Sequence, residues 1–195
     1  HPKDIAVEAG YAYEVIKNFS VSATFKYLFS DMGRIGNSRG ASSVAFDLGV
    51  LYKCEINDWE GAGWSVGLHV SNLGPKINYL TSKDALPATV KVGGAADLPF
   101  LQMHKLTLTA DLGYRLSPAD VQALSVSAGA EYAWRELVML RGGYHCGDKK
   151  KGDASYATAG AGVEYAGVRL DFAWLFAGHE YLARNTFWVS LGYSF

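Results

Sequence analysis

The sequence predicts an all-β protein, a transmembrane antiparallel β-barrel of the kind found in bacterial outer membranes. Segments in which apolar and polar residues alternate recur roughly every 15–20 residues, with turn residues between them. One set of alternating positions is apolar, and the other is small, polar or charged. The connections are short and long in turn, as in barrels with short periplasmic turns and longer outer loops.

The composition narrows the class of protein further. The chain has 195 residues and a net charge of −1, which allows a single domain and argues against a nucleic-acid partner. Gly (22) and Tyr (12) are frequent, whereas Pro (5) is rare. No run of about eighteen apolar residues occurs, so helical membrane spans are excluded.

About eleven strands are expected, each with one apolar face. In the first five, the apolar residues begin and end at Ile5 and Tyr13, Phe19 and Phe29, Val44 and Tyr52, Trp64 and Val70, and Val90 and Leu98. In the next five they begin and end at Leu106 and Tyr114, Leu124 and Trp134, Leu137 and Tyr144, Ala159 and Tyr165, and Val168 and Phe176. The second strand is strong because its apolar positions never change phase, and the sixth is the cleanest.

The last expected strand, residues 185–195, is about as long as a transmembrane β-strand needs to be. It ends on Phe195, and it resembles the C-terminal strand of outer-membrane barrels, whose terminal aromatic residue is part of the insertion signal. The alternative is an edge strand of a soluble sandwich.

The expected connections support the membrane reading. Short links such as 17–18 and 135–136 alternate with long ones such as 31–41 and 72–87. Ser117–Asp120 is the exception, because it is short on the side of the long loops. Aromatic residues gather near strand ends, as interfacial girdles require.

Charges of both signs occupy the face opposite the apolar one. Burying each of these charges in the core of a soluble sandwich would cost on the order of several kcal/mol of desolvation free energy. In a polar lumen the charges can pair and stay hydrated. This difference favours the membrane barrel. The expected lumen charges are Lys26, Asp47, Lys91, Asp111, Arg115, Glu131, Arg141, Glu164, Arg169 and Asp171.

Two further expectations follow from this topology. Cys54 lies at the turn end of its strand and Cys146 at the loop end, so both are expected to be free thiols. Bacterial barrels have an even number of strands with both ends periplasmic, and about eleven do not satisfy this rule. An odd number of preceding strands is therefore expected to be missing.

Two stretches carry a resemblance to a known family: Trp64-Ser-Val-Gly-Leu-His-Val-Ser-Asn-Leu-Gly-Pro-Lys-Ile-Asn-Tyr79 and Leu86-Pro-Ala-Thr-Val-Lys-Val-Gly-Gly-Ala95. They resemble the PorV family of the type IX secretion system. Residues 5–31 and the ending Asn185-Thr-Phe-Trp-Val-Ser-Leu191 are similar too, and the sister family PorQ is an alternative. The resemblance implies a FadL-like barrel of about fourteen strands. Residues 1–195 would then be the C-terminal part of one barrel domain.

The resemblance also implies a role without catalysis or cofactors, in the outer membrane of a Gram-negative bacterium. PorV-like proteins are shuttles that bind the C-terminal signal domain of cargo at the SprA (Sov) translocon and deliver it to the PorU-containing attachment complex. Outer-membrane lipid and lipopolysaccharide are the other expected partners. The alternative function is a FadL-like channel for hydrophobic small molecules, which an apolar lumen pocket would favour over a charged lumen.

The long link 72–87 is the best candidate for a functional segment, because it carries apolar residues on the outer side. Two roles remain open, contact with a partner and packing into the barrel mouth. The candidate partner-binding residues are Asn72, Leu73, Pro75, Lys76, Ile77, Tyr79, Leu86 and Pro87.

The remaining motifs favour simple structural readings. The five histidines show no metal-binding spacing, and His69 is expected to be a lumen residue. His179-Glu180 has no partner motif that would indicate a protease. Lys149-Lys-Lys151 is expected to be a solvated loop, with contact to anionic lipopolysaccharide as the alternative.

Overall fold

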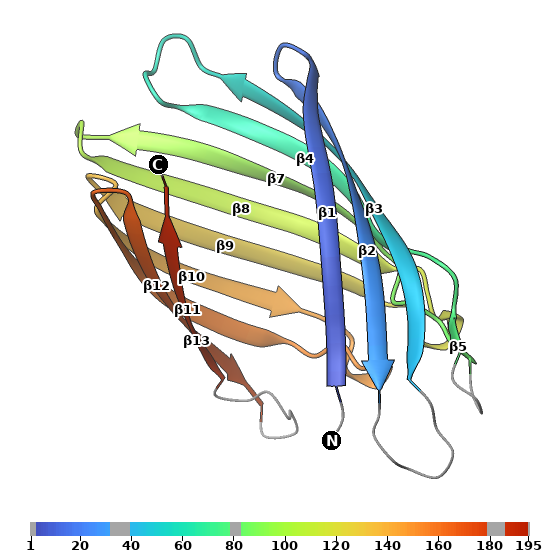
Figure 1. Ribbon diagram of the computed structural model, residues 1–195. Coiled ribbons are helices and arrows are strands. Elements are labelled where there is room, and N and C mark those ends of the chain that lie inside the picture. Colours follow the sequence, from blue (N-terminus) through green and yellow to red (C-terminus); the bar gives the residue numbers. More distant parts are fainter. Residues whose placement is uncertain (1–2, 32–39, 79–82, 179–185, 195) are drawn as a thin grey trace. The chain divides into compact units, whose positions relative to one another are not determined.

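The computed structural model describes all residues except 1–2, 32–39, 79–82, 179–185 and 195. Eleven strands form one antiparallel sheet in the order β1-β2-β3-β4-β7-β8-β9-β10-β11-β12-β13 (Figure 1). Their bounds are β1 Lys3–Ile16, β2 Phe19–Asp31, β3 Ala41–Glu55, β4 Gly63–Leu73, β7 Thr89–Phe100, β8 His104–Arg115, β9 Leu124–Trp134, β10 Val138–Cys146, β11 Tyr156–Tyr165, β12 Val168–Ala177 and β13 Phe187–Tyr193. A separate pair, β5 (Ile77–Asn78) and β6 (Lys83–Asp84), lies between β4 and β7 in the chain.

The all-β prediction and the expected strand number are confirmed. Every sheet neighbour is also the next long strand in the sequence, so the sheet is a simple meander, which is consistent with a β-barrel. Phe195, which ends the last predicted strand, lies outside the described residues. None of the helical turns in the described part of the chain has the length and hydrophobicity of a membrane-spanning helix.

The chain forms two compact units. The first unit contains residues 1–52, 67–92 and 113–123. The second unit contains residues 53–66, 93–112 and 124–195.

Tight hairpins join the strands at one end, which we call the turn end. Two-residue hairpins of type I′ need positive φ at both central residues. Three turns meet this requirement: Leu101–Gln102 (φ 49° and 57°), Arg135–Glu136 (53° and 56°) and Ala166–Gly167 (51° and 80°). Only Gly167 is a glycine, so the strand pairing imposes the left-handed conformation on the other five residues.

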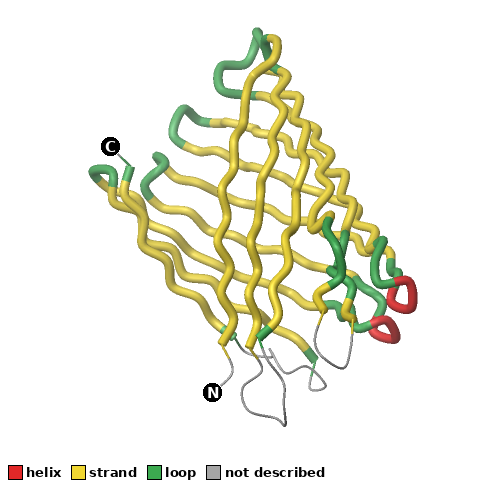
Figure 2. The backbone as a smooth tube through the Cα atoms, turned by 45° about the vertical axis from the view of Figure 1, so that its right-hand side comes forward, coloured by secondary structure: helices red, strands yellow, loops and turns green. Residues whose placement is uncertain are grey.

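The connections at the other end, the loop end, are longer (Figure 2). The link between β8 and β9 covers residues 116–123 and contains the 3₁₀ turn η1 (Ala119–Val121). It is therefore not the short exception that the sequence suggested. The link between β10 and β11 contains a second 3₁₀ turn, η2 (Lys149–Lys151).

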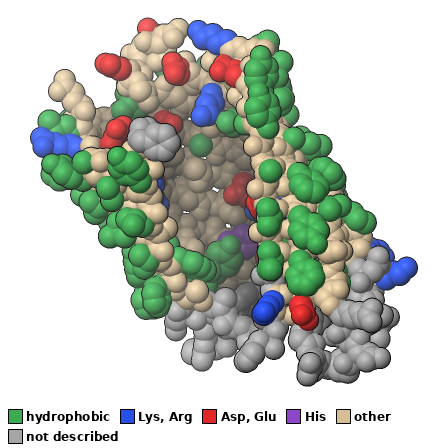
Figure 3. All heavy atoms as spheres, viewed as in Figure 1, with side chains coloured by type: hydrophobic (Ala, Val, Ile, Leu, Met, Phe, Trp, Pro, Cys, Tyr) green, Lys and Arg blue, Asp and Glu red, His purple; other side chains and the backbone are tan. Residues whose placement is uncertain are grey.

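The two faces of the sheet differ as predicted. In the first unit, the large apolar side chains of β3 are exposed, with Phe46 at 49% and Leu48 at 52%, while Ala45 and Asp47 on the opposite face are buried. In the second unit, Leu170 (51%) shows the same exposure. Hydrophobic side chains gather along β1 and β2 in Figure 3. We call these the apolar face and the polar face. Exposed apolar surface of this extent is typical of a protein that contacts lipid or a partner.

Candidate functional site

An ion-pair cluster occupies the polar face of the first unit. Lys26 in β2 lies 2.7 Å from Asp47 in β3 and 3.8 Å from Glu8 in β1. Register places Glu8 directly opposite Lys26, so both side chains leave the sheet on the same face. The Lys26 and Asp47 side chains are 16% and 10% exposed. Partly buried charges of opposite sign thus satisfy one another, as the sequence suggested.

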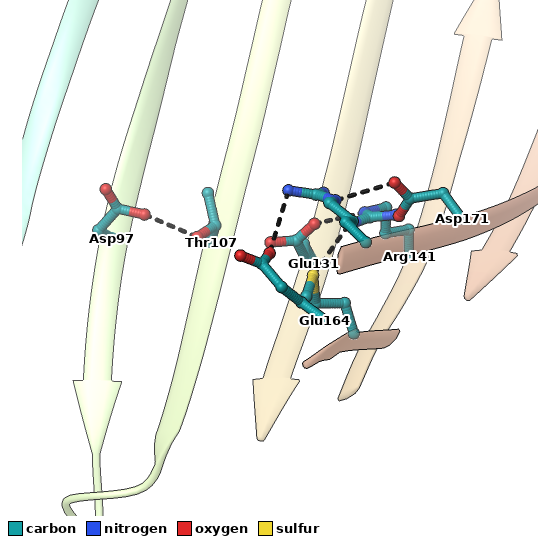
Figure 4. Close-up of polar contacts among 8 residues, drawn as sticks. Asp97, Thr107, Glu131, Arg141, Glu164 and Asp171 are labelled. Atoms are coloured by element: carbon teal, nitrogen blue, oxygen red, sulfur yellow. Dashed lines mark hydrogen bonds and ion pairs between the residues drawn. The ribbon is translucent and has the colours of Figure 1, made fainter. Parts of the chain in front are cut away.

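A second cluster centres on Arg141 in β10 of the second unit (Figure 4). Its guanidinium donates to Glu131 in β9, its register partner, and to Asp171 in β12 at 2.5 Å. Arg169 donates to the other oxygen of Asp171 at 2.8 Å and lies 3.8 Å from Glu164. Five predicted charges therefore form one network across four strands.

Glycine makes this network possible. Arg141 must cross β11 to reach Asp171, because β11 lies between β10 and β12. Gly162 in β11 pairs with Asp171, and a Cβ atom there would collide with the Asp171 carboxylate and lie 3.2 Å from Arg141 Nη1. The small residues in β11 thus leave room for a salt bridge between strands that are not neighbours.

The remaining charges differ in their surroundings. Asp97 in β7 accepts from Thr107 at 2.6 Å and lies 3.2 Å from Lys105. Asp111 Oδ1 is buried and has no hydrogen-bond partner among the described residues. Lys91 is exposed and Arg115 is half-buried.

Between β4 and β7 the described residues fold back within the first unit, and we call residues 72–78 and 83–88, which begin at the end of β4, the folded-back segment. Asn72 starts it in the left-handed conformation (φ 57°). The Asn72 backbone N–H donates to Asp47 Oδ1 at 2.8 Å, and the Asn72 side-chain oxygen accepts from Lys26 at 3.4 Å. The side-chain amide of Asn72 donates to the Pro87 carbonyl at 3.2 Å, which ties the two ends of the segment together.

The folded-back segment packs against the polar face of β3. A Cβ atom on Gly74 would collide with the Val44 carbonyl and lie 3.0 Å from Leu86. Ser43 Oγ donates to the Pro75 carbonyl at 3.1 Å, and Leu86 is only 7% exposed. The described part of this segment thus packs within the first unit.

The opposite side of the segment stays accessible. Leu73 is 37% exposed, and Pro75, Lys76 and Pro87 are exposed as well. Ile77 is half-buried and pairs with Asp84 in the β5–β6 hairpin. Two predicted features, Tyr79 and the His179-Glu180 pair, lie outside the described residues.

One cluster was missed by the sequence reasoning. His145 Nε2 lies 3.0 Å from Asp153 Oδ1, and His145 Nδ1 lies 3.0 Å from Ser127 Oγ. The His145 ring stacks on Tyr156 with centroids 4.8 Å apart. A signal existed: extending the pairing from the Arg135–Glu136 turn places Ser127 opposite His145. Asp153 lies in the loop between β10 and β11, and the position of a loop residue cannot be predicted from the alternation of apolar and polar residues.

Two candidate chemistries concern cysteine and metal. Cys54 and Cys146 are free, as expected. Within the part of the chain that the structure describes, no three His, Cys, Asp or Glu side chains are grouped to hold a metal ion. His69 lies beside Gly49, 3.4 Å from the position of a Cβ there, as expected for a residue of the polar face.

Comparison with known families decides the identity of the chain. The family model for "Type IX secretion system protein PorV" matches residues 1–122, more than half of the 195 residues. The chain belongs to the PorV family. The match contains both stretches that carried the resemblance and the whole folded-back segment of this PorV-family chain. A search of curated proteins finds no match. Membership connects the chain with type IX secretion.

Proposed function

We propose that this PorV-family chain is an outer-membrane shuttle of the type IX secretion system. It binds the C-terminal signal domain of secreted cargo at an SprA-type translocon and delivers the cargo to a PorU-type attachment complex. It acts by binding and not by catalysis. The family membership supports the secretion role, and the exposed apolar face supports a place in the outer membrane, where lipid covers that face. The strands would belong to a single barrel domain of about fourteen strands, as the family resemblance implies.

The observation that carries the proposal is that the folded-back segment packs on one side and is exposed on the other. Asn72 and Gly74 hold this part of the segment against β3, so its backbone is in place before a partner binds. Leu73, Pro75 and Lys76 are left on the exposed side. A surface that is already ordered loses little conformational entropy on binding, which raises affinity for a given contact area.

The test alters the exposed side and leaves the packed side unchanged. Leu73→Asp combined with Lys76→Glu places two negative charges on the surface where we propose partner contact, in place of an apolar and a positive side chain. We expect co-purification of translocon and cargo signal domains from native outer membranes to fall about tenfold or more. Asp120→Lys, an exposed change in the β8–β9 link of the same unit, serves as the control.

Unchanged co-purification of the double variant, at unchanged levels in the membrane, would remove the proposed contact. The alternative channel for hydrophobic small molecules gains no support from the first unit. An apolar cavity in this unit is lined by Tyr11, Tyr13 and Leu48 on the apolar face of the sheet. The polar face of the same unit carries the Lys26–Asp47 ion pair.

A further inference from the structure

The loop between β10 and β11, residues 147–155, is ordered from within. The Asp148 side chain accepts from the Lys150 backbone N–H at 3.0 Å and so caps η2. Gly152 ends the turn in the left-handed conformation (φ 75°), and its N–H donates to the Lys149 carbonyl at 3.2 Å. The Asp153 N–H returns to the Asp148 carbonyl at 3.1 Å. These bonds fix the backbone that carries three consecutive lysines.

The same loop is also anchored to the sheet. Asp153 binds His145, which in turn contacts Ser127 and stacks on Tyr156, as described above. The Gly147 N–H donates to Ser155 Oγ at 3.3 Å, and Ala154 is only 2% exposed. The His145 contacts therefore have a structural purpose: they hold the base of the loop against β9 and β11.

The lysines are available to a partner. All of Lys149–Lys151 is exposed. Among the residues that the structure describes, neither Lys149 nor Lys150 forms an ion pair. The nearby acidic groups are engaged elsewhere, since Asp148 caps η2 and Asp153 binds His145.

The lysines also lie next to the apolar face. Tyr144 (55% exposed) and the exposed Cys146 end the apolar positions of β10, and Cys146 pairs with Val126 (43% exposed) in β9. Lys149 follows Cys146 by three residues, which an extended chain spans in about 10 Å. If lipid covers the apolar face, a lysine ammonium on its long flexible stem can reach the headgroup layer at the edge of that face.

We propose that Lys149 and Lys150 bind the phosphate groups of outer-leaflet lipid, with the His145 contacts holding the loop in place. This inference rests on the outer-membrane location proposed above. Lipid is favoured over an acidic peptide because β10, which leads into the loop that carries the lysines, ends with the exposed Tyr144 and Cys146. A lipid supplies both an anionic headgroup and acyl chains, and so it matches both features at once.

The test measures lipid binding by the full chain reconstituted in phosphatidylcholine nanodiscs. Diphosphoryl lipid A is the probe, and lipid A without phosphates is its control. Replacing both lysines with glutamine, Lys149→Gln and Lys150→Gln, should weaken binding of the phosphorylated probe by about fivefold for each lysine, about 25-fold together. Lys17→Gln, in the exposed turn-end link after β1, should change nothing.

Three results would overturn the inference. The first is an unchanged affinity of the double variant, and the second is equal binding of the lipid without phosphates by the wild-type chain. The third is a loss of cargo capture with unchanged lipid affinity, which would assign the lysines to an acidic peptide. A wild-type chain that does not enter bilayers would instead contradict the outer-membrane location itself.

Discussion

At the scale of single residues, the polar face depends on where side chains are absent as much as on where charges are present. Arg141 reaches Asp171 only because Gly162, in the strand between them, has no side chain in the way. Partly buried carboxylates without this guanidinium would repel one another and lack hydrogen-bond donors. The glycine therefore stabilises the network without taking part in it.

The variant Gly162→Ala tests this dependence. The added Cβ displaces the Asp171 carboxylate from Arg141, and we expect the free energy of unfolding to fall by about 1–3 kcal/mol. Denaturant unfolding in lipid vesicles measures the change. Gly142→Ala is a matched control, because nothing lies within 4 Å of a Cβ there. Equal stability of the two variants would show that the crossing of β11 tolerates a side chain.

At the scale of elements, the link between β4 and β7 behaves as part of the fold and not as an ordinary surface loop. Its first residue joins the Lys26–Asp47 cluster, and its glycine lies directly on the β3 backbone. Such a segment is held by contacts of the sheet, so its order depends on those contacts being intact.

Gly74→Ala tests the attachment of the folded-back segment. Because the new Cβ would meet the Val44 carbonyl, which is backbone and cannot rotate away, the segment must move off β3. We expect backbone amides in residues 83–88 to exchange with solvent at least about tenfold faster, as local opening becomes easier. Hydrogen exchange with mass spectrometry reads this out. Gly178→Ala, whose new Cβ would have no atom of the described residues within 4 Å, should leave the exchange unchanged. Protection that survives in Gly74→Ala would contradict the packing described.

At the scale of the whole molecule, the two faces impose different environments on adjacent residues. In each unit the larger apolar side chains are exposed, while charges on the opposite face pair with one another. Water would penalise that much exposed apolar surface, whereas hydrocarbon would not. The distribution thus agrees with the outer-membrane location that we propose.

Two neighbouring substitutions in β8 test this assignment. Leu108 is 43% exposed on the apolar face, and Thr109 donates to the Gly129 carbonyl on the polar face. If the apolar face contacts hydrocarbon, Leu108→Arg should lower the stability of the folded chain in vesicles by about 2–4 kcal/mol, and Thr109→Arg by under about 1 kcal/mol. Unfolding titrations in lipid give both values. A similar cost for the two would argue against a lipid-covered face.

The sequence predicted the strands well, because a sheet with two different environments imposes a strict period of two. β9 has the predicted bounds, and the other long strands differ only by a few residues at their ends. The β5–β6 pair and η1 were not predicted, since such short elements carry no periodicity. The candidate segment was located by its apolar residues, but its packing on β3 was not evident.

By itself, the sequence determined the alternation of faces, the number of long strands and the resemblance to the family, because each of these depends on a local pattern or motif. Only the tertiary structure decided which charges meet. Arg141 donates to Asp171 across an intervening strand, and the Asn72 N–H donates to Asp47. His145 contacts both Ser127 and Asp153. Such contacts depend on register and loop geometry together, and these emerge only once the strands have paired.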